Sequence, residues 1–75
     1  MDEQELDTRG LNCPLPVLRA RKVLRGMAPD AVLRLLATDP GTVRDVGAMC
    51  EATGDQLMES SEKAGEFVFL IKKAG

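Results

Sequence analysis

Cys13 is the residue whose type and position most clearly predict chemistry in this chain. It stands in the segment Asn12-Cys13-Pro14-Leu15-Pro16. A residue before proline avoids helical backbone angles, and proline suits the first position of a helix. We therefore expect Cys13 at the N-cap of a helix that runs from about Pro14 to Arg25, with its thiol exposed at the helix N-terminus.

This helix start is expected to lower the pKa of the thiol modestly. Only the thiolate is nucleophilic, and a helix N-terminus favours negative charge. Pro14 and Pro16 have no N–H, so the two prolines of this helix-start motif stiffen the site more than they charge it. Arg9, close in sequence, and Arg19, further along the helix, are candidates for additional positive potential at the sulfur.

An exposed, mildly activated cysteine without a general base suits the carriage of sulfur. It can take the outer sulfur of a donor persulfide and hold it as Cys–S–S⁻, which is itself nucleophilic. The chain has no histidine and only two cysteines, so His-assisted catalysis is excluded and neither a metal site nor a cofactor is expected. Cys13 could instead be an inert edge-of-core residue, or a redox thiol if Cys50 lay close to it.

Composition fits one small globular domain over residues 1–75. The net charge is −2 and aromatic residues make up 3% of the chain, which argues against tight nucleic-acid binding. No apolar run is long enough to span a membrane and the N-terminus has no signal-peptide pattern, so we expect a cytoplasmic protein.

Hydrophobic periodicity predicts the order strand-helix-strand-helix-strand-strand. The second helix, from Pro40 to about Ala52, should bury Cys50 and Val43 and turn Asp45 away from the core. Two helices for four strands predict an α/β (α+β) two-layer sandwich, a mixed sheet with both helices on one face. The strands are expected at residues 5–9, 31–38, 56–61 and 66–72, the last of them interior because both of its sides are apolar.

Two leucines interrupt the basic side of the first helix. Leu15 and Leu18 would face water beside Cys13, and either form a docking patch or lie under a loop or the N-terminal tail. The candidate docking residues are Arg9, Leu15, Leu18, Arg19 and Lys22. The alternative function is an RNA-binding or regulatory protein-interaction module that uses the basic face formed by Arg19, Arg21, Lys22 and Arg25.

The motif and its surroundings resemble a known family. The segment from Gly10 to Pro16, followed by Val17 to Lys22, is similar to the CPxP signature of the TusA (SirA-like) family of sulfur carriers. Residues 37–45 resemble a second block of that family, and the last strand with Lys72-Lys73 fits its end. The resemblance extends from about Leu6 to Lys73.

The resemblance implies both a fold and an activity. The fold would be similar to the C-terminal domain of translation initiation factor three, with strand order first-second-fourth-third and the fourth strand antiparallel to the others. The activity would be acceptance of persulfide sulfur on Cys13 from a cysteine desulfurase or rhodanese. A downstream acceptor protein in tRNA 2-thiolation, molybdenum cofactor supply or sulfur oxidation would receive it. Leu15 replaces an acidic residue of the best-studied branch, which leaves that acceptor open, and we expect a monomer that makes transient complexes.

Overall fold

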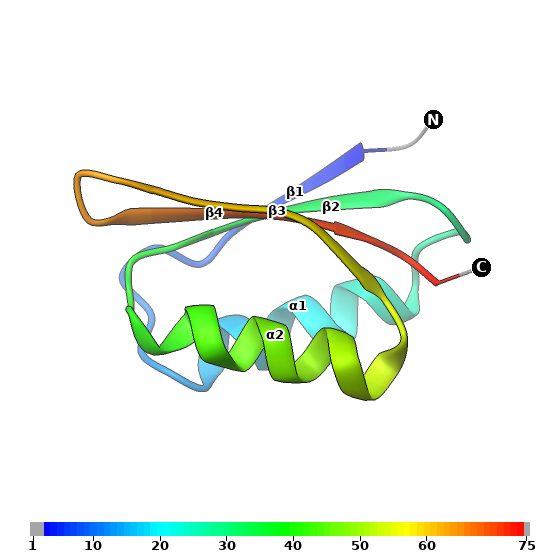
Figure 1. Ribbon diagram of the computed structural model, residues 1–75, viewed down its shortest axis with the longest axis horizontal. Coiled ribbons are helices and arrows are strands. Elements are labelled where there is room, and N and C mark those ends of the chain that lie inside the picture. Colours follow the sequence, from blue (N-terminus) through cyan, green and yellow to red (C-terminus); the bar gives the residue numbers. More distant parts are fainter. Residues whose placement is uncertain (1–2, 75) are drawn as a thin grey trace.

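The computed structural model describes residues 3–74, which form two layers: a sheet, and two helices on one of its faces (Figure 1). This arrangement confirms the predicted two-layer α+β sandwich. The elements in chain order are β1 (Glu3–Asp7), α1 (Leu15–Arg25), β2 (Val32–Ala37), α2 (Gly41–Thr53), β3 (Gln56–Lys63) and β4 (Glu66–Lys72). No helix within this range is long and apolar enough to cross a membrane.

The sheet order is β1-β2-β4-β3, as the family resemblance implied. β1 pairs with β2 in parallel, and β4 lies antiparallel between β2 and β3. The interior position predicted for residues 66–72 is therefore correct. Phe67, Phe69 and Ile71 of this strand are buried under the helices, whereas Val68 and Leu70 are half-buried on the opposite face.

The core fills the space between the sheet and the helices. α1 contributes Ala20 and Leu24 to it, because residues four apart lie on one side of a helix. The remaining buried members are Leu33, Leu35, Ala37, Val46, Met49, Cys50, Phe67, Phe69 and Ile71. The first helix of the chain is thus attached to the sheet by small and branched side chains on one face, which leaves its other face free.

Several details differ from the sequence prediction, among them the start of β1 at Glu3 rather than residue 5 and the end of β3 at Lys63 rather than residue 61. β1 ends at Asp7, and Thr8 is buried with its N–H donated to the Leu36 carbonyl at 2.8 Å, so Arg9 lies beyond the strand. In α2, Val43 is 43% exposed and Thr42 is buried in its place. Both residues border the apolar side of the helix, and its rotation against the sheet decided between them.

The fold brings the two helix starts to the same end of the molecule. Because β1 and β2 are parallel, the loops that follow them leave the same edge of the sheet. The two helices then run back in the same direction (Figure 1). Segments that are distant in sequence, around Cys13 and around Asp39, therefore meet at this edge.

Candidate functional site: a cysteine between two helix starts

Cys13 lies just before α1 and is exposed to solvent. The first helical residue is Leu15 and its N-cap is Pro14, so the prediction of Cys13 as the N-cap is wrong. The first i to i−4 bond of the helix is accepted by the Pro14 carbonyl, from the Leu18 N–H at 3.1 Å, whereas the Cys13 N–H donates to Asp39 Oδ2 at 2.7 Å. Cys13 is therefore anchored to the start of α2 as well as to the start of its own helix.

Asp39 joins the two helix starts through one carboxylate. Its Oδ2 accepts the Cys13 N–H, and its Oδ1 accepts the N–H of Gly41, the first residue of α2, at 2.8 Å. These two hydrogen bonds lower the pKa of Asp39 below its usual range. The carboxylate is thus charged at neutral pH and fixes the segment that carries the thiol.

The sulfur lies against the first turns of α2. A Cβ placed on Gly41 would stand 3.3 Å from Asp39 Oδ1, 3.4 Å from Cys13 Cβ and 3.6 Å from Cys13 Sγ, so the thiol packs directly against the start of the helix. One turn further on, the Asp45 carboxylate accepts a hydrogen bond from the Cys13 thiol. The sequence predicted only that Asp45 faces away from the core, and this contact with the thiol was not predicted.

The electrostatics of the site oppose the thiolate. The pKa of Cys13 is raised, first by the hydrogen bond to Asp45, then by partial desolvation and by the charges of Asp45 and Asp39. Arg44 acts in the opposite direction and is the weaker influence. The predicted lowering of this pKa by the first helix is therefore wrong. The N–H of Leu15, which could have faced the sulfur, donates instead to the Asn12 carbonyl at 2.9 Å.

Arg9 pairs with carboxylates and is not among the charges that shift the pKa of the Cys13 thiol. Its Nε and Nη2 donate to the two carboxylate oxygens of Asp7 at 2.9 and 2.8 Å, and its Nη1 lies 3.6 Å from Glu66 Oε1. The pairing with Arg9 lowers the pKa of Asp7 to about 2. Arg19 is not among the charges that shift the pKa of Cys13, so neither predicted cation reaches the sulfur.

Four of the predicted docking residues form one surface. Leu15, Leu18, Arg19 and Lys22 have the spacing of neighbours on one side of a helix, and all are exposed. We call this surface the α1 stripe. Leu15 is 44% exposed and Leu18 54%, so within residues 3–74 no loop or tail covers them. Pro16, on the opposite side, is buried in the core and fixes the helix against the sheet.

Cys50 is buried in the core, as predicted. It is 7% exposed, and burial raises the pKa of its thiol. Cys50 lies on α2 five residues beyond Asp45, about 7.5 Å along the helix axis from the residue that contacts the Cys13 thiol, and its side chain is in the core. The Cys13 thiol is exposed and donates to Asp45, whereas Cys50 is enclosed in the core, and this argues against the redox pair considered from the sequence.

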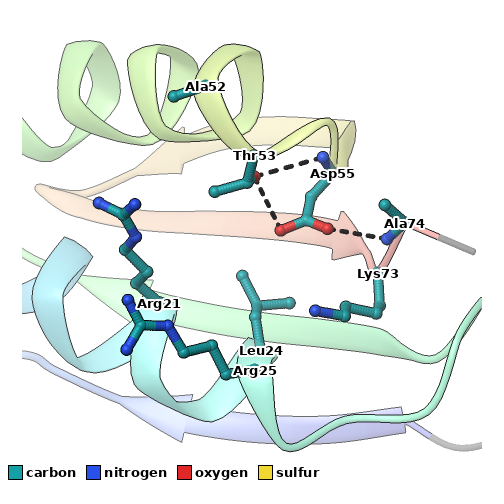
Figure 2. Close-up of a pocket in the computed structure, with 8 residues that line it drawn as sticks. All are labelled: Arg21, Leu24, Arg25, Ala52, Thr53, Asp55, Lys73 and Ala74. Atoms are coloured by element: carbon teal, nitrogen blue, oxygen red, sulfur yellow. Dashed lines mark hydrogen bonds between the residues drawn. The ribbon is translucent and has the colours of Figure 1, made fainter.

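Two basic residues of α1 line a cavity near the C-terminal ends of both helices. Arg21 and Arg25 line a cavity of about 300 Å³ together with Lys73 and the buried Asp55 (Figure 2). The carboxylate of Asp55 accepts hydrogen bonds from the Thr53 hydroxyl and the Ala74 N–H. Leucines of the α1 stripe lie between this pair of arginines and Arg19 on the helix surface. The exposed side of α1 is therefore mixed apolar and basic, which favours a protein partner over an RNA backbone.

Asp39, Gly41 and Asp45 are the site residues that the sequence prediction missed. The sequence did contain a signal for two of them, because Gly41 and Asp45 are four residues apart and so share one side of the predicted second helix. A glycine and a carboxylate on one side of a helix indicate room for an approaching group and an acceptor for its hydrogen. What the sequence did not contain was which group approaches.

Known proteins resemble this chain over nearly its whole length. The family profile described as "Sulfurtransferase TusA" matches residues 4–73. The sulfur carrier protein TusA of Allochromatium vinosum is 57% identical over 72 residues, which cover 96% of this chain and 95% of that protein. A putative sulfur carrier protein of Neisseria meningitidis is 44% identical over 96% of this chain and 97% of its own.

A solved structure agrees as well. The crystal structure of a SirA-like protein from Desulfitobacterium hafniense superposes with a TM-score of 0.85 at 28% identity, covering 96% of this chain and 99% of that one. On the strength of the profile match and these relatives, the chain belongs to the TusA family of sulfur carriers.

Proposed function

We propose that this sulfur carrier holds its cargo as a persulfide on Cys13. The observation that carries the proposal is the position of this thiol, exposed and anchored between two helix starts, with the other cysteine of the chain buried in the core. A carrier needs a sulfur that two successive partners can reach. The arrangement offers one such atom.

The transfer requires no oxidant and no cofactor. Cys13 Sγ attacks the outer sulfur of the donor's persulfide, the S–S bond of the donor breaks, and its electron pair leaves with the donor's inner sulfur. The thiol proton of Cys13 ends on that leaving sulfur. Delivery repeats the step in the opposite sense, when an acceptor thiolate attacks the outer sulfur on Cys13 and Sγ leaves.

A carrier implies transient donor and acceptor proteins, and the α1 stripe is our proposed docking surface for them. It begins beside Cys13, and it presents two exposed leucines together with the cations of Arg19 and Lys22. Such a surface suits a partner with an apolar groove and an acidic rim. The proposed donor is a cysteine desulfurase or a rhodanese, and the acceptor belongs to tRNA 2-thiolation, molybdenum cofactor supply or sulfur oxidation.

The wider setting follows from the same proposal. The chain acts as a single sulfur-carrier domain over residues 1–75, in the cytoplasm, where thiols remain reduced. It works as a monomer, because a carrier must leave one partner before it reaches the next. The weak, exposed contacts of the α1 stripe suit such short-lived complexes.

The decisive experiment follows the sulfur itself. Incubation of the chain with a cysteine desulfurase and cysteine, followed by intact mass spectrometry, should show one added sulfur atom that dithiothreitol removes. Cys13→Ala should lose the adduct completely. Cys50→Ala is the matched control and should keep it, provided that circular dichroism shows a folded chain. An adduct that persists in Cys13→Ala would contradict the proposal.

A further inference from the structure

The immediate surroundings of the Cys13 sulfur carry more negative than positive charge. Asp45 and Arg44 act on it from α2, and Asp39 acts from the loop before that helix. The basic residues of α1 are not among the groups that shift its pKa, and the segment Gly10-Leu11-Asn12 has no ionisable side chain. The thiol of a nucleophilic carrier thus lies beside two carboxylates and one weaker cation.

The contact between the thiol and Asp45 is built into the backbone. Asp39 accepts the Cys13 N–H at 2.7 Å and the Gly41 N–H at 2.8 Å. These two bonds fix the position of the Cys13 backbone relative to the start of α2. The sulfur packs against the start of that helix, 3.6 Å from the position that a Cβ would take on Gly41. Asp45 stands one turn beyond Gly41 and accepts the hydrogen of the thiol. The hydrogen bonds to Asp39 and the packing against Gly41 together place the sulfur at this carboxylate.

We propose that Asp45 is an electrostatic restraint on the carrier, which keeps Cys13 as a neutral thiol in the free chain and releases it when a partner places a positive charge against the carboxylate. Asp45 acts through Cys13 and is a positioning residue. This proposal rests on the proposed function and adds the chemistry of the partner. A donor that loads this chain has a lysine or arginine beside its persulfide, opposite Asp45.

The Asp45 carboxylate acts differently on the unloaded thiol and on the loaded persulfide. In the unloaded chain the carboxylate accepts the thiol hydrogen and so stabilises the protonated form. In the loaded chain Sγ is bonded to a second sulfur and has no hydrogen to donate, while the outer sulfur is anionic. The same carboxylate then repels the cargo. Asp45 thereby favours the unloaded state of the free carrier, and a cation from the partner removes this preference during loading.

The first test measures the ionisation of Cys13 directly. The rate of alkylation by iodoacetamide, a neutral reagent, is followed from pH 6 to pH 10 with the modified site identified by peptide mass spectrometry. Asp45→Asn should move the midpoint of the profile to lower pH. Its rate at pH 7 should rise about threefold, because the larger thiolate fraction outweighs the lower nucleophilicity of a more acidic thiol. Glu51→Gln, the same change on an exposed position of α2, should leave the profile unaltered.

The second test supplies the positive charge. Thiol–disulfide exchange of Cys13 with cystamine, which has two ammonium groups, is compared with exchange with dithiodipropionate, the anionic disulfide of similar size. The wild-type chain should react several times faster with cystamine, and Asp45→Asn should reduce the ratio of the two rates at least about twofold. Asp45→Ser repeats both tests without a carboxylate, in case the asparagine variant does not fold.

The outcomes separate this proposal from the proposed function. A midpoint that stays in place or moves to higher pH in both uncharged variants overturns the restraint, as does an unchanged ratio of cystamine to dithiodipropionate rates. Neither measurement requires sulfur transfer. If the desulfurase experiment gave no adduct on Cys13 while the profile moved as expected, the sulfur-carrying role would be wrong and the restraint would remain correct.

Discussion

Asp39 makes two hydrogen bonds that hold the thiol segment to the second helix, and this single carboxylate determines the geometry of the site. It accepts the N–H of Cys13, twenty-six residues away in sequence, and that of Gly41. Hydrogen bonds to an ionised acceptor are stronger than those between neutral groups. We therefore expect Asp39 to contribute to stability and to the orientation of Cys13 together.

Asp39→Asn should lower the melting temperature by a few degrees at pH 7. An asparagine has one carbonyl oxygen where the carboxylate has two, so one of the two N–H groups loses its acceptor. Because the pKa of Asp39 is lowered in the folded chain, its contribution is fully present above the unfolded pKa of about 4. It is lost as the pH falls through the lowered folded value. The difference between wild type and Asp39→Asn, measured by differential scanning calorimetry, should be largest near neutral pH and shrink toward pH 2.

Asp30→Asn is the matched control for this change. Asp30 is exposed and its carboxylate has a single ion-pair contact, at 3.7 Å from Lys72 Nζ. Surface pairs of this kind contribute little, so this variant should melt close to the wild type at every pH. Equal losses in the two variants would mean that net charge, rather than the two backbone hydrogen bonds, accounts for the effect.

At the scale of elements, the sequence predicted well what depends on periodicity and poorly what depends on helix rotation. The alternation of Phe67, Phe69 and Ile71 with Val68 and Leu70 indicated an interior strand, and β4 is interior. The thiol's partner depended on contact between α1 and α2, which no local pattern records. The rotation of α2 buries Thr42 where Val43 was predicted, and it brings Asp45 to the sulfur, a contact that the sequence did not predict.

The α1 stripe is the element whose role a single substitution can test. Leu18→Glu should slow the transfer of sulfur from a cysteine desulfurase at least about fivefold, because a charge replaces an apolar contact at the proposed interface. The rate of iodoacetamide alkylation at Cys13 should stay the same, since no residue of α1 is among the groups that shift the pKa of this thiol. Single-turnover transfer, followed by mass spectrometry, measures the first quantity.

Met58→Glu provides the control for the stripe. Met58 is 52% exposed, close to the 54% of Leu18, but it lies on β3 and not on α1. Its substitution introduces the same charge and should leave the transfer rate unchanged. If both variants slowed transfer equally, the effect would come from overall charge, and the proposed docking surface would be wrong.

The whole molecule is asymmetric, because both helices cover the same face of the sheet (Figure 1). The covered face contains the fully buried side chains, and the opposite face has a half-buried apolar band that includes Val68 and Leu70 between charged neighbours such as Arg34. A chain of 75 residues has a free energy of unfolding of only about 4–11 kcal/mol. In a monomer, nearly all of this free energy must come from side chains buried on the covered face. Substitutions on the two faces should therefore have unequal effects on stability, and this inequality tests the monomeric state.

Ile71 and Leu70 are isomeric side chains at successive positions of β4, on opposite faces of the sheet. Ile71 is 0% exposed in the core and Leu70 is half-buried on the open face. Ile71→Ala should reduce the free energy of unfolding by about 3 kcal/mol through lost burial and a residual cavity, and Leu70→Ala by about 1 kcal/mol. Urea denaturation at several protein concentrations measures both. Similar losses, or a midpoint for Leu70→Ala that depends on concentration, would indicate that a second copy of the chain covers the open face, and a carrier that works as a monomer would then be excluded.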